Sequence, residues 1–183
     1  RPVRDHAKCY ELVLAAIDSG KAESILGNHE LSYMIPKHQC SGYQRDRREM
    51  FMQYKNDINS KFQSFMTFPG NWIVTHAGLH PIVLANGIRD YPNLDPKTGE
   101  GFQLWIDDTH SSAHWIGRYR GGNNSVGGIF WCDFKAEFEP IENLNQIFGH
   151  TAGQEIRTRC TPDSFNYCID CLDHQPTFLE LDF

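Results

Sequence analysis

Three short apolar runs in this chain each end in a loop that places asparagine or histidine beside glycine. The segments are Leu26-Gly27-Asn28-His29-Glu30, Val74-Thr75-His76-Ala77-Gly78 and Phe148-Gly149-His150-Thr151. Short apolar runs bounded by glycine are typical of buried strands. Functional residues of α/β proteins gather on the loops beyond strand ends. The pattern therefore predicts a layered α/β protein in which Asn28, His76 and His150 converge.

These three side chains would offer one amide oxygen and two imidazole nitrogens to a bound ion. That donor set suits a borderline divalent metal such as Mn, Fe or Zn, although carboxylates normally complete the coordination. Glu30 is the carboxylate within the three segments, and we assign it no ligand role. A single loop histidine is more often a hydrogen-bonding residue than a ligand, so the metal hypothesis depends on all three segments.

Composition limits the alternatives. The chain has 183 residues, 40% of them hydrophobic and 22% charged, which favours one globular domain over residues 1–183. A net charge of −6 argues against nucleic acid as the main partner. No apolar run approaches the roughly 20 residues that span a bilayer, and residues 1–6 lack the apolar region of a signal peptide. We therefore expect a cytoplasmic protein without a membrane partner, whose six scattered cysteines are reduced.

Local patterns predict the order of the elements. A helix is expected over residues 6–19, capped by Asp5 and ended by Gly20, with Cys9, Leu12, Val13, Ala16 and Ile17 on its apolar face. One long helix, or two, is expected over 46–68, and a further helix over 102–116. Strands are expected at 24–26, 72–74, 147–148, 155–159, 166–171 and 177–181.

The ordered motifs resemble those of the calcineurin-like metallophosphoesterases, and within them the phosphoprotein phosphatase branch. The resemblance rests on Gly27-Asn28-His29-Glu30, Thr75-His76-Ala77-Gly78-Leu79, Ile129-Phe130-Trp131-Cys132-Asp133 and Phe148-Gly149-His150-Thr151. That branch includes phage and bacterial Ser/Thr phosphatases and diadenosine tetraphosphatases. The resemblance covers most of the chain and implies an α/β/β/α sandwich.

The resemblance also implies roles for individual residues. In that family two metal ions about 3.5 to 4 Å apart share a bridging hydroxide that attacks phosphorus in line. By motif, Asn28, His76 and His150 would bind the second ion, and His29 would protonate the leaving oxygen. The resemblance thus predicts two divalent ions, with Mn the first expectation and Fe or Zn the alternatives.

Two motifs of the family are absent from the chain. An Asp-x-His pair and a Gly-Asp-x-x-Asp-Arg-Gly segment would supply the ligands of the first metal, and both belong upstream of Gly27. Arg1-Pro2 is similar to the end of the second motif. We therefore expect the sequence to be a truncated form whose dinuclear site is incomplete.

Phosphate binding requires arginine, whose planar fork of donors matches phosphate oxygens. Arg120, in Arg118-Tyr119-Arg120-Gly121-Gly122, is our candidate, with a solvated surface arginine as the alternative. Arg1 is a second candidate if it is the arginine of the missing motif.

Other suggestive residues have ordinary structural explanations. Cys168-Ile169-Asp170-Cys171 resembles half a zinc ribbon, but no second pair exists, and its alternation favours a buried strand. His110 and His114 are spaced as two ligands on one helical face, yet lack a partnering acid. For them, and for His38, His80 and His174, we expect solvated or capping roles.

The sequence thus predicts a metal-dependent phosphatase that acts on phosphomonoesters, with phosphoproteins or dinucleoside polyphosphates as candidate substrates. Two alternatives remain open. One is a phosphodiesterase for polynucleotide ends or cyclic phosphates. The other is a non-catalytic binding module that retains the fold and half of a metal site.

Overall fold

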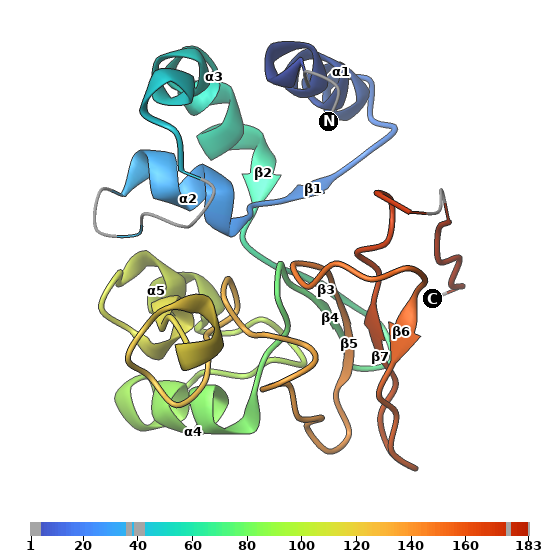
Figure 1. Cartoon of the computed structure of the whole chain (residues 1–183). Helices are drawn as coiled ribbons and strands as arrows, with labels where there is room; N and C mark the ends of the chain where they lie inside the picture. The colour runs from blue at the N-terminus through green and yellow to red at the C-terminus, as the bar shows by residue number, and fades with distance from the viewer. Residues whose placement is uncertain (1–4, 36–37, 39–42, 175–176, 183) are drawn as a thin grey trace. The chain divides into compact units, whose positions relative to one another are not determined.

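The computed structural model describes residues 5–35, 38, 43–174 and 177–182, except for the side chain of Asp46. The chain divides into two compact units, Arg1–Gln63 and Ser64–Phe183, and each is described by itself (Figure 1). The described residues form a mixed α/β chain with a two-stranded and a five-stranded sheet. The mixed α/β class agrees with the sequence, whereas the α/β/β/α sandwich stays a prediction.

Unit 1 combines three helices with a two-stranded parallel sheet in its described part. The elements are α1 His6–Asp18, β1 Ser24–Ile25, α2 Asn28–Met34, α3 Arg45–Lys61 and β2 Phe62–Gln63. Helix α1 forms as predicted. The Asp5 carboxylate accepts a hydrogen bond from the Lys8 N–H at 3.0 Å, and Gly20 follows the helix with φ +70°, a conformation that glycine adopts without strain.

The buried face of α1 is not the one predicted. Cys9, Leu12 and Val13 are exposed, while Leu14 is buried. The reason is aromatic packing: the ring of Tyr10 stacks on Tyr54 of α3, with centroids 5.6 Å apart. This contact sets the rotation of α1 about its axis. The face of α1 that meets α3 therefore carries Tyr10 and Leu14, one helical turn apart, in place of the predicted apolar face.

Helix α2 was not predicted, because its residues were assigned to a loop. It begins directly after Gly27, which has an extended backbone. The Glu30 carboxylate accepts hydrogen bonds from the Gly27 N–H at 3.1 Å and from the Tyr10 hydroxyl at 2.9 Å. Burial and the nearby Glu30 carboxylate hold the pKa of Tyr10 above its usual range, so this hydroxyl stays a donor. Glu30 thus closes the first turn of α2 and ties it to α1.

The predicted helix over 46–68 is wrong beyond Lys61. Residues Phe62–Gln63 form β2, which pairs in parallel with β1, and Met66–Phe68 form β3. The helical part is held by a core that contains Tyr33, Phe51 and Ile58. Phe62 and Met66 fit a helical repeat, but their pairing with distant strands decides their conformation.

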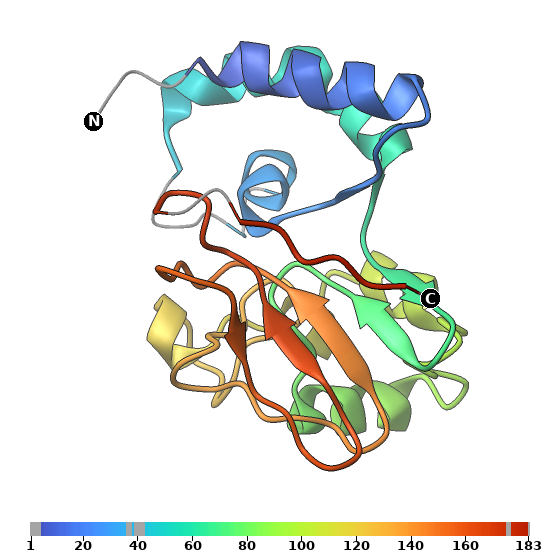
Figure 2. The same cartoon turned by 90° about the vertical axis from the view of Figure 1, so that its right-hand side faces the viewer.

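Unit 2 is built on the five-stranded sheet, whose order is β3-β4-β5-β7-β6 (Figure 2). Its strands are β3 Met66–Phe68, β4 Trp72–Val74, β5 Asn145–Phe148, β6 Arg157–Thr158 and β7 Asn166–Cys168. Strands β4, β5 and β7 are parallel, and the two edge strands run antiparallel to their neighbours. The strands predicted at 72–74 and 147–148 are confirmed, those at 155–159 and 166–171 are shorter than predicted, and residues 177–181 form none.

Helices α4 Pro81–Asp90 and α5 Phe102–Asp107 lie on one side of this sheet (Figure 1). Helix α4 was not predicted. The helix predicted over 102–116 ends at Asp107, and a short 3-10 helix, η2 Ser112–His114, follows after a turn. His110 and His114 therefore do not share a helical face.

Gln146, at the centre of the sheet, fixes the loop that follows β4. Its side chain is fully buried. The amide oxygen accepts a hydrogen bond from the Leu79 N–H at 2.8 Å, and the amide nitrogen donates to the Leu79 carbonyl at 3.1 Å. One side chain thus satisfies both backbone groups of Leu79, as a neighbouring strand would.

Within the described part of the chain, no helix combines the length and the apolar character that crossing a membrane requires.

Candidate metal and phosphate site

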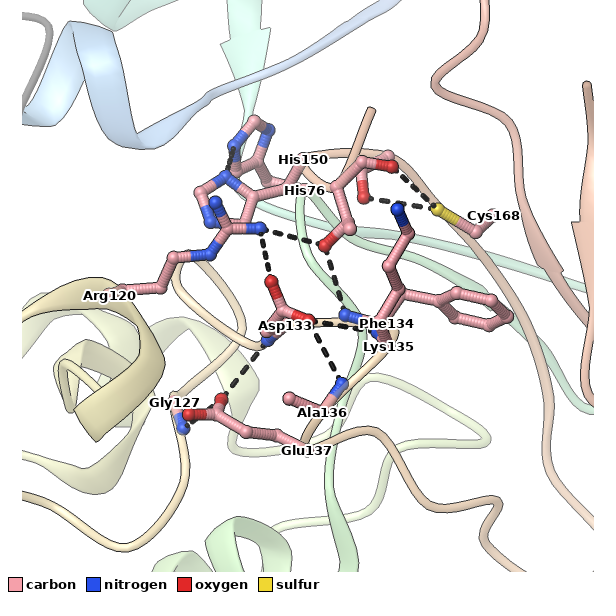
Figure 3. Close-up of polar contacts among 12 residues, drawn as sticks. His76, Arg120, Gly127, Asp133, Phe134, Lys135, Ala136, Glu137, His150 and Cys168 are labelled. Carbon is pink, nitrogen blue, oxygen red and sulfur yellow. Dashed lines mark hydrogen bonds and ion pairs between the residues drawn. The ribbon is translucent and has the colours of Figure 1, made fainter. Parts of the chain in front are cut away.

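His76 and His150 meet in the loops beyond β4 and β5. These strands are parallel neighbours, so the loops at their carboxyl ends lie side by side. Nε2 of His76 lies 3.0 Å from Nδ1 of His150, although the two residues are 74 positions apart. Figure 3 shows the two rings turned toward each other. The structure therefore brings together these two predicted ligands.

The geometry of this pair fits two adjacent ligands of one ion. Two atoms bound at about 2.1 Å and at right angles to each other are about 3.0 Å apart. The ring planes are inclined by 63°, with centroids 4.9 Å apart, so the nitrogens meet without the rings stacking. The same distance also suits a hydrogen bond between the rings when one of them donates.

The described residues contain no group of three or more His, Cys, Asp or Glu side chains placed to hold a metal ion. The pair offers two nitrogens, so it fits part of a coordination sphere, and a complete sphere would need further oxygen donors.

His150 adopts a backbone conformation that is costly for any residue except glycine. Its φ is +65°, in the left-handed region. The peptide groups around it are held on both sides: the Gly149 N–H donates to the His76 carbonyl at 2.8 Å, and the Thr151 N–H donates to the Gly149 carbonyl at 2.7 Å. The first of these bonds joins the two histidine loops directly.

The His76 loop is equally constrained. The Ala77 N–H donates to the Ile129 carbonyl at 2.8 Å, and the Gly78 N–H donates to the Thr75 hydroxyl at 3.1 Å. Gly78 has φ +91°, and a Cβ at this position would lie 3.1 Å from the ring of Phe138. The loop therefore depends on glycine both for its backbone conformation and for space.

Arg120 reaches the same site from the 3-10 helix η3 Arg118–Arg120. Its Nη2 lies 2.8 Å from Oδ2 of Asp133 and donates to the Thr151 hydroxyl at 2.8 Å. The side chain is 26% exposed. Two defined partners and partial burial disfavour the alternative of a solvated surface arginine. They anchor the predicted phosphate-binding group to Thr151, the residue that follows His150 in the sequence.

Asp133 is engaged within its own turn as well as with Arg120. Its Oδ1 accepts the N–H groups of Lys135 and Ala136 at 2.9 and 3.0 Å. The Asp133 N–H donates to Oε2 of Glu137 at 3.1 Å, and the same oxygen accepts from the Gly127 N–H at 2.9 Å. Figure 3 shows this chain of contacts below Arg120. Glu137 thus fixes the turn that presents Asp133.

Sequence reasoning missed the contribution of Thr151 to this site. It belongs to the segment quoted for its histidine, and no local pattern distinguishes its hydroxyl from that of any loop threonine. Its two contacts, to Arg120 and to the Phe134 N–H at 2.9 Å, come from segments that lie 31 and 17 positions away in the sequence.

Asn28 and His29 begin α2 in unit 1, where Asn28 is buried and His29 is exposed. The other predicted site residues belong to unit 2, so the convergence of Asn28 with His76 and His150 stays a prediction, as does the role of His29. Arg1 lies outside the described residues.

The residues given ordinary roles have structural partners. His80 caps α4, because its Nδ1 accepts the Ile82 N–H at 3.0 Å. Nε2 of buried His114 lies 2.7 Å from the Ile106 carbonyl. Cys168 and Cys171 are buried, and burial raises the pKa of the Cys168 thiol, so this group is a neutral packing residue. His38 is buried, and His174 is exposed.

Comparison of the chain with models of protein families, with curated proteins and with solved structures gave no match.

Proposed function

We propose that this protein is a metal-dependent phosphatase that acts on phosphomonoesters. The observation that carries the proposal is the 3.0 Å approach of His76 to His150, next to an arginine held through Thr151. Ligand nitrogens beside a guanidinium form a combination suited to a divalent ion and a phosphate group bound together.

The charge balance of this cluster supports an anionic substrate. Both imidazoles are neutral when they act as ligands. The carboxylate of Asp133 is paired with Arg120 and accepts two backbone N–H groups. The charge of Asp133 is therefore compensated and would repel a phosphate dianion less than a free carboxylate would. Phosphoproteins are the candidate phosphomonoesters, and dinucleoside polyphosphates are a second candidate class of substrate.

Each residue has a defined task in this proposal. His76 and His150, with Asn28, would hold one of two divalent ions, for which Mn is the first choice. When bound, such ions supply the charge that activates water and polarises the phosphoryl oxygens. Arg120 would bind and orient the phosphate, and His29 would donate a proton to the leaving oxygen.

One observation favours a second candidate, a binding module without catalytic activity. The described residues lack the carboxylate cluster that would bridge two ions. A module of this kind would bind one ion or a phosphorylated ligand and release no phosphate. A phosphodiesterase for polynucleotide ends or cyclic phosphates is the corresponding alternative within the enzymes.

The central experiment measures metal content and turnover in the natural protein supplied with Mn²⁺. The substrates are a phosphomonoester, a phosphopeptide, diadenosine tetraphosphate and a cyclic nucleotide. His76→Ala and His150→Ala are each expected to lower metal content and turnover together. His174→Ala, an exposed histidine, is the matched control. Metal binding without turnover on any substrate would favour the binding module, and unchanged metal content in both site variants would refute the proposal.

A separate prediction tests His29. His29→Ala is expected to lower kcat by about 10²- to 10⁴-fold, the usual contribution of a general acid, with metal content unchanged. The loss should be smaller for nitrophenyl phosphate, whose leaving group needs little protonation. Equal losses for alkyl and nitrophenyl phosphates would exclude His29 from the acid role.

A further inference from the structure

The hydroxyl of Thr151 joins two segments of the candidate site. Oγ1 accepts hydrogen bonds from Nη2 of Arg120 at 2.8 Å and from the Phe134 N–H at 2.9 Å. A hydroxyl oxygen has two acceptor positions, and both are occupied. The side chain is buried, so water does not compete freely for these bonds.

The backbone of Thr151 is held as firmly as its hydroxyl. Its carbonyl accepts hydrogen bonds from Nη2 of Arg157 and, at 3.6 Å, from the thiol of Cys168. Gly153 leaves room for the guanidinium, since a Cβ there would lie 2.4 Å from Nε of Arg157. The position of the Thr151 hydroxyl is therefore set by strands β6 and β7, which carry Arg157 and Cys168.

The second partner of Arg120 completes the constraint. Nη2 carries two protons, and the two acceptors are Oγ1 of Thr151 and Oδ2 of Asp133, each at 2.8 Å. Two acceptors on one nitrogen fix the plane of the guanidinium, because rotation about the Nε–Cζ bond would break both bonds. Nε has no hydrogen-bond partner among the described residues, so the fork retains a donor that these contacts do not use.

We infer that Thr151 is a positioning residue that fixes the Arg120 guanidinium before phosphate binds. The role in phosphate binding rests on the proposed function, whereas the fixed position of Arg120 rests on the contacts above. Fixing the fork in advance removes the entropy cost of ordering a flexible arginine at the moment of binding. Thr151 also follows His150 directly, so the phosphate-binding group and the histidine pair share one anchored segment.

The test compares Thr151→Val, which keeps the shape and removes the hydroxyl, with Thr151→Ser, which keeps the hydroxyl. Thr98→Val is the control, because the Thr98 hydroxyl donates to Asp95 in an exposed turn. The first readout is the NMR signal of the Arg120 guanidinium in the natural protein. Slow rotation, with separate Nη signals, is expected for wild type, Thr151→Ser and Thr98→Val, and averaged signals are expected for Thr151→Val.

The second readout is binding of inorganic phosphate and turnover of a phosphomonoester. Thr151→Val is expected to weaken phosphate binding and raise KM about tenfold, the scale of one lost hydrogen bond to a charged group, with metal content unchanged. In an Arg120→Ala background the same substitution should have no further effect, because Thr151 acts through Arg120.

The outcomes separate the two proposals. Unchanged Arg120 signals in Thr151→Val, or a lower Tm as the sole effect, would overturn the positioning role. Averaged signals in Thr151→Val, together with a wild type that neither binds phosphate nor turns over any phosphoester, would keep the positioning role and refute the proposed function. If Thr151→Val does not fold, Thr151→Ala provides the same loss of the hydroxyl with less bulk.

Discussion

His150 combines a strained backbone with a functional side chain. Strain of this kind costs a folded protein about 1–2 kcal/mol, and here the bonds around Gly149 and Thr151 maintain it. At this position the backbone conformation favours glycine, whereas the candidate site requires the imidazole of histidine.

A matched pair of substitutions measures that separation. His150→Gly is expected to be about 1 kcal/mol more stable than His150→Ala, because glycine adopts a positive φ without the Cβ penalty. Both variants should lose the contact with His76 and bind metal equally poorly. Chemical denaturation and metal analysis are the measurements, and equal stability of the two variants would contradict the strain argument.

Two glycines near Arg120 have different requirements. A Cβ on Gly117 would lie 2.1 Å from Oε1 of Glu137, whereas a Cβ on Gly121 would meet nothing within 4 Å, although φ there is +84°. Gly117→Ala should lower the free energy of unfolding by about 3 kcal/mol through overpacking, and Gly121→Ala by about 1 kcal/mol through strain. Thermal unfolding of both variants tests this order, and the reverse order would contradict it.

At the scale of single elements, His80 makes helix α4 sensitive to acid. Burial lowers the pKa of His80, against the opposing effects of Glu139 and Glu137. The folded state therefore binds this proton less readily than the unfolded chain, whose histidine has a pKa near 6.5. The contribution of neutral His80 to the free energy of unfolding is therefore full above that pH, and it is lost as the pH drops below about 6.5. Protonation would also remove the acceptor for the Ile82 N–H.

His80→Asn is the matched variant, since asparagine is a good helix cap and does not titrate. Its free energy of unfolding should fall less between pH 7 and pH 5 than that of the wild type. Denaturant titrations at a series of pH values provide the measurement. Identical acid slopes for the two proteins would show that His80 does not contribute.

Several elements with local signals were predicted, whereas those decided by distant partners, and the two helices α2 and α4, were not. Helix α1 follows from Asp5 and Gly20, and β4 from its apolar run. Residues Phe62–Gln63 and Met66–Phe68 fit a helical repeat, yet they form strands because β1 and β4 offer them partners. Helix α2 was missed because its start depends on Glu30 bonding back to Gly27, inside a motif interpreted as a loop.

The same limit applies to the site as a whole. His76 and His150 could be predicted as neighbours because each follows an apolar run, and parallel strands bring such ends together. The Asp133 and Thr151 contacts of Arg120 could not be predicted, since they depend on how three irregular segments fold over the sheet.

Across the whole molecule, the two units have separate cores. Phe51 belongs to the core of unit 1 and Phe138 to that of unit 2, and both rings are fully buried. Replacing either by alanine should cost about 3–5 kcal/mol. Phe51→Ala is expected to speed hydrogen exchange mainly within residues 5–63, and Phe138→Ala mainly within 64–182. Equal acceleration in both units for either variant would show that they open as one cooperative body.

The paired bonds from Gln146 to Leu79 have a consequence for how the sheet assembles. A shift of one residue between β4 and β5 would turn Gln146 to the opposite face. Both backbone groups of buried Leu79 would then lack these partners, at a cost of about 1–3 kcal/mol each. The buried glutamine thus specifies the register of β4 and β5, because a misregistered sheet would leave polar groups of the loop after β4 without partners.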